Sequence, residues 1–247
     1  MNEKESKRYK TDALLGALGA FLMLVGDLCL SVIPASNGDS GLFQREAYFS
    51  GSWEAWRLPL LVATVLCGMS LGFFTVRLSY LQIKPQYRKT RLAVLTGGVI
   101  YVATAGALHL FIGSLADWTN TLSSLLGREE ATALIQAQYN RLMPAMYISY
   151  AGMFLLVLTS AFVVLTKKTV LPRWIFALHM IVFQILFVLI PDIRQAFGAD
   201  VSTRDFVLSQ GSGNAALCIW MIVNAVRAFC RPEPTENAEE RTGISQE

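Results

Sequence analysis

Charged residues are scarce in this chain of 247 residues: Asp, Glu, Lys and Arg make up 16% of it, and hydrophobic residues make up 53%. Water-soluble domains usually carry about 25% charged residues. The shortage is also uneven, because six long apolar segments together contain only four charged side chains. The composition therefore excludes a soluble enzyme, a nucleic-acid-binding protein and a disordered chain.

Cysteine and histidine are also few, which excludes several kinds of metal and redox site. The four cysteines form no CxxC pair, so the chain has neither a zinc ribbon nor a thioredoxin-like motif. Only two histidines occur, and because neither belongs to an HxxxH or HExxH motif, a three-histidine zinc site cannot be built. A GxSxG nucleophile elbow and a phosphate-binding glycine loop are missing as well. We therefore expect no metal and no cofactor.

The apolar residues gather in segments of 19 to 24 residues. A helix needs about 20 apolar residues to cross the hydrocarbon core of a bilayer. Strands are excluded, because an open sheet edge cannot be satisfied in lipid. The sequence predicts an all-α, polytopic membrane helix bundle (residues 13–229) with six transmembrane helices over residues 13–33, 58–81, 92–115, 143–165, 172–190 and 208–229.

The distribution of lysine and arginine predicts the orientation of this bundle. Fifteen of the 21 basic residues, including every lysine, fall on the same side as the N-terminus. The positive-inside rule then places the N-terminal segment 1–12 and the polar tail 230–247 in the cytoplasm, with the tail disordered. The apolar run 13–33 is too long for the core of a signal peptide, so we interpret it as a retained span.

Two long connections, residues 34–57 and 116–142, are predicted on the outer side. Apolar positions between 131 and 142 are spaced for one helical face, which indicates an amphipathic helix on the outer interface. Such a helix would either rest on lipid or cap a cavity. Interfacial anchoring is expected for Trp53, Trp56, Trp118 and Trp174.

One acidic residue, Asp27, lies deep within a predicted span. It stands six residues from the outer end, or about 9 Å at 1.5 Å per residue, where a carboxylate must find a partner, water or a proton. Small residues around His109 indicate that its face packs inward. The same depth in the five other spans carries a hydrogen-bonding side chain: Thr64, His109, Ser149 with Tyr150, Gln184 and Asn214. We expect a polar pocket that opens outward.

Several functions fit such a pocket. The leading hypothesis is binding of a small molecule or lipid, with Asp27 and His109 as the central residues and Tyr150, Gln184 and Asn214 in support. A membrane-embedded hydrolase or transferase would use Asp27 and His109 as an acid–base pair. A proton-coupled transporter would change the protonation of Asp27, although the apolar inner halves of the spans disfavour it. Interhelical hydrogen bonds that only hold the bundle are a further alternative.

The deeper histidine, His179, has apolar helical neighbours. We expect it to be neutral and bonded to a backbone carbonyl or to another span. A metal site of two histidines and Asp27 is disfavoured by the missing motifs. Beyond Pro191, Asp192 and Arg194 would gate an entrance or, more simply, form a solvated pair.

The Gly26–Asp27 step, the long outer loop after it and the inward-facing His109 together carry a resemblance. The chain resembles an uncharacterised family of six-span bacterial integral membrane proteins over roughly residues 12–229. The resemblance implies a six-helix fold in the bacterial inner (plasma) membrane, with membrane lipid as the surrounding partner. It implies no catalytic activity and no functional residue.

Overall fold

The computed structural model describes residues 3–36, 39 and 45–230, and within these ranges the chain is helical and has no strand. Six of its helical segments are long and apolar enough to span a membrane, which confirms the predicted all-α, six-span class. They are α1 (Glu3–Ser31), α3 (Arg57–Gln82), α4 (Arg88–Leu126), α5 (Arg128–Leu165), the pair η1 (Arg173–Leu178) and α6 (Met180–Ala196), and α8 (Ser212–Cys230). The predicted disorder of the tail concerns residues 231–247, which lie outside the described ranges.

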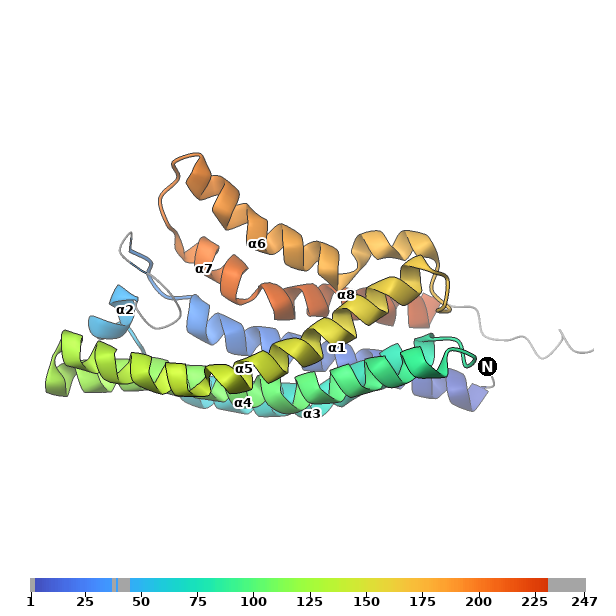
Figure 1. The fold of residues 1–247 in the computed structure, drawn as a ribbon. Coiled ribbons are helices and arrows are strands. Elements are labelled where there is room, and N and C mark those ends of the chain that lie inside the picture. The colour runs from blue at the N-terminus through green and yellow to red at the C-terminus, as the bar shows by residue number, and fades with distance from the viewer. Residues whose placement is uncertain (1–2, 37–38, 40–44, 231–247) are drawn as a thin grey trace, which may run out of the picture.

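The bundle has two distinct ends (Figure 1). At the terminal end, α1 begins and α8 ends. At the opposite end, here called the loop end, lie the two short helices α2 (Glu46–Phe49) and α7 (Thr203–Gln210). The long α4–α5 hairpin extends furthest at the loop end, and α6 diverges from α5 in the same direction (Figure 1).

Glycines set the closest helix contacts. A Cβ atom added to Gly97 of α4 would lie only 2.9 Å from the carbonyl oxygen of Gly152 on α5. The corresponding distance from Gly19 of α1 to the carbonyl of Gly68 on α3 is 3.0 Å. Small residues allow membrane helices to approach in this way. These contacts fix α1 against α3 and α4 against α5, and so position two walls of the site described below.

The amphipathic segment predicted over residues 131–142 is helical, but it is not a separate helix on the interface. This segment is the first part of α5, which starts directly after a turn at Gly127, where φ is +85°. Its apolar face exists, but Ala131 and Ile135 are buried in protein contacts instead of lying on lipid. An amphipathic pattern records that one face is covered, and it does not tell whether lipid or protein covers it.

The last two predicted spans are interrupted. The fifth begins as the short 3-10 helix η1 and breaks at His179, which has extended backbone angles and accepts a hydrogen bond from the Ile181 N–H. The sixth is divided at Gly211 into α7 and α8. Neither break follows a proline, and Pro144 and Pro191 both lie inside helices.

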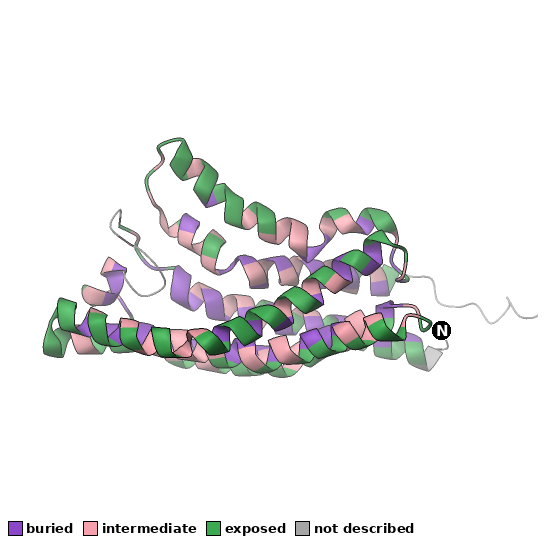
Figure 2. Ribbon diagram, viewed as in Figure 1, coloured by how far each residue is buried: buried purple, intermediate pink, exposed green. Residues whose placement is uncertain are grey.

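Exposed residues run along the outer faces of the long helices (Figure 2), and many of them are large and apolar. Large side chains such as Phe21, Leu92 and Phe154 are more than half exposed, as expected where lipid forms the solvent. Three of the four predicted anchor tryptophans are exposed as well: Trp56, Trp118 and Trp174. Trp53 is the exception, because it is buried and its ring nitrogen donates to Asp117 Oδ1 at 3.1 Å.

Candidate functional site

A cavity of about 490 Å³ lies between α1, α4, α5, α6 and the α7–α8 junction, in the half of the bundle towards the loop end. It reaches the level of Asp27, four residues before the end of α1. All five predicted site residues line it: Asp27, His109, Tyr150, Gln184 and Asn214. Thr64 does not, because its hydroxyl is turned back to donate to the Leu60 carbonyl at 2.8 Å.

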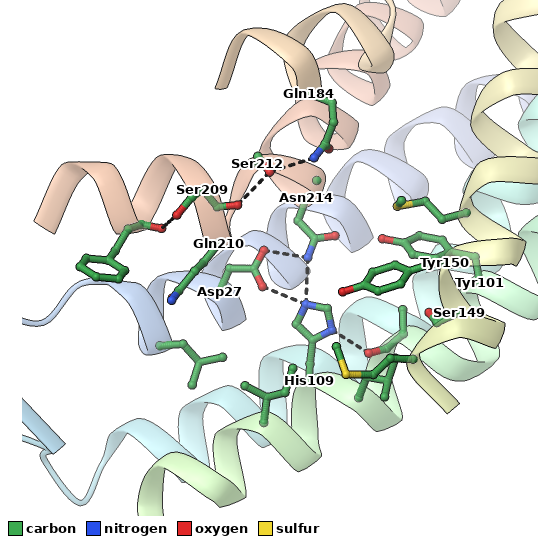
Figure 3. Close-up of a pocket in the computed structure, with 18 residues that line it drawn as sticks. Asp27, Tyr101, His109, Ser149, Tyr150, Gln184, Ser209, Gln210, Ser212 and Asn214 are labelled. Carbon is green, nitrogen blue, oxygen red and sulfur yellow. Dashed lines mark hydrogen bonds and ion pairs between the residues drawn. The ribbon is translucent and has the colours of Figure 1, made fainter. Parts of the chain in front are cut away.

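Three of these residues meet directly and are called the cavity cluster: Asp27, His109 and Asn214 (Figure 3). Asp27 Oδ1 lies 2.8 Å from His109 Nε2, and Asp27 Oδ2 accepts a hydrogen bond of 2.8 Å from Asn214 Nδ2. The contacts therefore join α1, α4 and α8 at one point. Asp27 and Asn214 are both buried.

The geometry of the imidazole determines how many protons the cluster holds. His109 Nδ1 lies 2.6 Å from the Ala105 carbonyl oxygen, which can only accept, so Nδ1 carries a hydrogen. Nε2 then faces a carboxylate oxygen at hydrogen-bond distance, and two bare acceptors would repel each other there. One further proton must lie between Nε2 and Oδ1. The pair is thus neutral overall, either as imidazolium with carboxylate or as imidazole with carboxylic acid.

Asn214 contributes an atom that the protein leaves unsatisfied. Its Oδ1 is buried and has no hydrogen-bond partner within the described part of the chain. Figure 3 shows this oxygen on the side where Tyr101 and Tyr150 lie. Most buried polar atoms in native proteins have a partner, and leaving one unpaired costs about 1–3 kcal/mol. A hydrogen-bond donor placed in the cavity would remove that cost.

Gln184 is held on the opposite wall by a short chain of hydrogen bonds. Its Nε2 donates to Ser212 Oγ at 2.9 Å, and Ser212 Oγ donates to the Ser209 carbonyl at 3.0 Å. These contacts connect α6 to the α7–α8 junction. The remaining lining side chains are mostly apolar and include Leu30, Leu108, Ile112, Met146, Met153 and Phe206. The cavity is therefore amphipathic.

Sequence reasoning missed several lining residues, of which Tyr101 had a readable signal. Tyr101, Ala105 and His109 are spaced four residues apart on α4, so they share one face. Ser209 and Ser212 give no such signal, because both fall within the single span predicted over residues 208–229. The kink at Gly211 turns both of them to the cavity.

Arg45 was also missed, although it fixes the end of α1. This fully buried guanidinium donates to the carbonyls of Ser31 at 3.1 Å and Ile33 at 2.6 Å, and so satisfies acceptors that the end of α1 leaves free. Its centre lies 4.1 Å from the ring of Phe206, which lines the cavity. Burial lowers the pKa of Arg45 from its ordinary value, and burial raises the pKa of the neighbouring Tyr48 to about 12.

A latch at the loop end joins α6 to α7. Arg194 donates to Asp205, and both the backbone and the hydroxyl of Ser202 donate to the other carboxylate oxygen, at 2.9 and 2.7 Å. The expected pairing of Arg194 with Asp192 is wrong, because the partner lies on the next helix. Burial alone would raise the pKa of Asp205. The hydrogen bonds from Arg194 and Ser202 outweigh this effect and bring the pKa below its ordinary value.

His179 lies apart from the cavity cluster. Its Nδ1 accepts from a backbone N–H, so Nε2 carries the hydrogen that is shared with Ser160 Oγ at 3.0 Å. Its ring also packs against Trp220. The prediction that His179 bonds to another span is confirmed, since Ser160 lies on α5. Over the described ranges, no group of three or more His, Cys, Asp and Glu side chains is placed to hold a metal ion.

Comparisons with known proteins give a family but no activity. A search of curated proteins and a search of solved structures each returned no match. A family model does match, over residues 1–224, and its description is Family of unknown function (DUF6796). The resemblance to an uncharacterised family is thereby confirmed, and the chain belongs to the DUF6796 family.

Proposed function

We propose that this chain is an integral protein of the bacterial inner membrane that binds a small molecule or lipid at the cavity cluster. The observation that carries the proposal is the unpaired, buried Asn214 Oδ1 beside a neutral Asp27–His109 pair on the wall of a cavity. Ligand pockets typically measure about 300–1,000 Å³ and combine apolar walls with a few placed polar groups. The cavity agrees with this description in both respects.

The orientation belongs to the same proposal. The loops that contain Lys84 and Lys167 lie at the terminal end, together with the start of α1 and the end of α8 (Figure 1). The positive-inside rule assigns this end to the cytoplasm, with both termini. The cavity then opens in the outer half of the membrane.

Filling the cavity tests the proposal. Leu108 lines it, whereas the adjacent Ala107 on α4 is exposed on the surface. Leu108→Trp and Ala107→Trp therefore form a matched pair that adds the same ring inside and outside the cavity. Each protein is purified after incubation with a bacterial membrane extract, and bound compounds are identified by mass spectrometry. We expect a compound bound to wild type and Ala107→Trp to be missing from Leu108→Trp; equal recovery would contradict the proposal.

An acid–base enzyme is the second candidate function. It is favoured by the 2.8 Å contact between His109 Nε2 and Asp27 Oδ1, because a proton held between two groups of a cavity wall is available to a bound molecule. The test is incubation of wild type and His109→Gln with labelled membrane lipids. Product formed by wild type alone supports an enzyme, and binding without turnover supports the leading proposal.

A proton-coupled transporter has less support. Beyond the cluster, towards the terminal end, the adjoining space is a cavity of about 30 Å³ whose lining includes Ala20, Met23, Met69 and Val102. Such apolar walls disfavour a path for a proton or a polar substrate. Uptake of a solute driven by a proton gradient, in liposomes that contain the purified protein, would favour the transporter over the other two functions.

A further inference from the structure

A second, apolar cavity adjoins the first. This groove of about 250 Å³ lies between α5 and α6 and shares Tyr101, Met153, Gln184 and Gly213 with the polar cavity. Its other walls are formed by hydrocarbon side chains such as Val157, Ile181, Ile185 and Leu217. The two spaces are therefore neighbours with common walls, one of them polar and the other apolar.

The groove faces the surface that meets lipid. Phe154 and Leu158 on α5 and Ile185 on α6 border it and are each more than half exposed. Along this side α6 leaves α5, and the two ribbons diverge towards the loop end (Figure 1). An apolar chain can enter here sideways from the bilayer. A water-soluble compound gains nothing from contact with these apolar side chains.

The polar part selects an uncharged group. The Asp27–His109 pair is neutral because it holds one shared proton, and no Lys or Arg occurs among the described residues that line the cavity. A phosphate or carboxylate would therefore lose its hydration without gaining a cation. A hydroxyl or amide group loses much less, and its hydrogen can be donated to the unpaired Asn214 Oδ1.

We infer that the site takes an uncharged, single-chain amphiphile, whose hydroxyl- or amide-bearing head binds at the cavity cluster and whose acyl chain lies in the α5–α6 groove. The inference rests on the proposed function and names the class of its ligand. The amphiphile enters sideways from the outer half of the membrane. A monoacylglycerol has the required chemistry.

The experiment compares two lipids with the same chain and different heads. The protein is placed in nanodiscs of two-chain phospholipids, since a sugar detergent is itself an uncharged single-chain amphiphile. The probes are monooleoylglycerol and oleoyl lysophosphatidic acid, each with a photoreactive group in the chain. We expect the first probe to label groove segments on α5 and α6, and the second to bind at least tenfold more weakly.

Two tryptophan variants on α6 test the path of the chain. Ile181 lines the groove, and Leu186 lies on the lipid-facing surface of the same helix. Ile181→Trp should weaken binding of monooleoylglycerol at least tenfold, and Leu186→Trp should leave it unchanged. Val157→Trp obstructs the groove from α5 and replaces Ile181→Trp if that variant does not fold.

The outcomes separate this inference from the proposed function. Unchanged binding to folded Ile181→Trp or Val157→Trp overturns the groove as the chain site, and equal binding of the phosphate-bearing probe overturns the uncharged head. If either result occurs while Leu108→Trp still removes a bound compound, the proposed function stands and the inference fails. If neither probe binds and Leu108→Trp has no effect, both fail.

Discussion

Two polar clusters connect α1 to α8, one near each end of the bundle, and they differ in what they leave unpaired. The terminal cluster consists of Tyr9, Gln82 and Asn224. Gln82 Nε2 donates to the Tyr9 hydroxyl at 3.0 Å and to Asn224 Oδ1 at 2.6 Å, and Asn224 Nδ2 donates to a backbone carbonyl at 2.7 Å. The oxygen and the nitrogen of the Asn224 amide are therefore both hydrogen-bonded within the bundle.

The cavity cluster has the same arrangement but a different chemistry. It also joins α1 and α8 to a third helix, yet it contains an ionisable pair, lines a cavity and leaves Asn214 Oδ1 without a partner. Hydrogen bonds between membrane helices typically contribute only about 0.6 kcal/mol each. Hydrogen bonding between helices is a sufficient role for the terminal cluster. It does not explain why the cavity cluster retains a carboxyl group and an unpaired amide oxygen.

Replacement of Asp27 should have the largest effect. Asp27→Leu removes the shared partner of His109 and Asn214, and each buried polar group left without a partner costs about 1–3 kcal/mol. Asp27→Asn should cost about 1 kcal/mol or less, because its amide can donate to His109 Nε2 and accept from Asn214. The measurement is the apparent melting temperature in nanodiscs, followed by tryptophan fluorescence.

The asparagine variant also tests the proton count. It reproduces the neutral form of the pair, in which a hydrogen on residue 27 points to the imidazole. If Asp27→Asn is as unstable as Asp27→Leu, the cluster needs a carboxylate with a full negative charge. The cavity cluster would then differ from the uncharged terminal cluster by a buried charge and not only by a shared proton.

An intermediate effect is expected at the terminal cluster. Asn224→Leu deprives Gln82 of its shortest hydrogen bond and should lower the free energy of unfolding by about 1–3 kcal/mol. Compound retention at the cavity should not change, since the cluster lies at the other end of α8. Val226→Leu, a lipid-facing change on the same helix, serves as the control. Loss of binding in folded Asn224→Leu would show that the two clusters act together.

The class of the fold follows from the sequence because its signal is local. Six apolar runs of sufficient length require six helices in lipid, whatever their neighbours. The exact ends depend on tertiary partners and were therefore missed. The α4–α5 hairpin continues past the predicted spans because its apolar faces bury each other, and the break at His179 is stabilised by Ser160, 19 residues away.

The part of the candidate site that could be predicted is the set of residues at a common depth in the predicted spans. A count of residues from the span ends placed Asp27, His109 and Asn214 at one level, and the structure brings them into contact. Their role in binding stays a prediction. Arg45 was not predictable, because its carbonyl partners lie 12 to 14 residues away across a loop without any periodic pattern.

The smallest effect is expected at the latch between α6 and α7, which holds the loop end of the cavity wall. Hydrogen bonds from Arg194 and Ser202 outweigh the effect of burial and keep the pKa of Asp205 below its ordinary value. The latch therefore contributes its full stability above the unfolded-state pKa of about 3.9 and loses it as the pH falls through the lower folded-state pKa. The apparent melting temperature of wild type should fall on acidification below about pH 4, and Asp205→Asn should show a smaller fall. Identical profiles for the two proteins would mean that the latch contributes nothing to stability, and that α6 is held at the cavity through Gln184 and Ser212 instead.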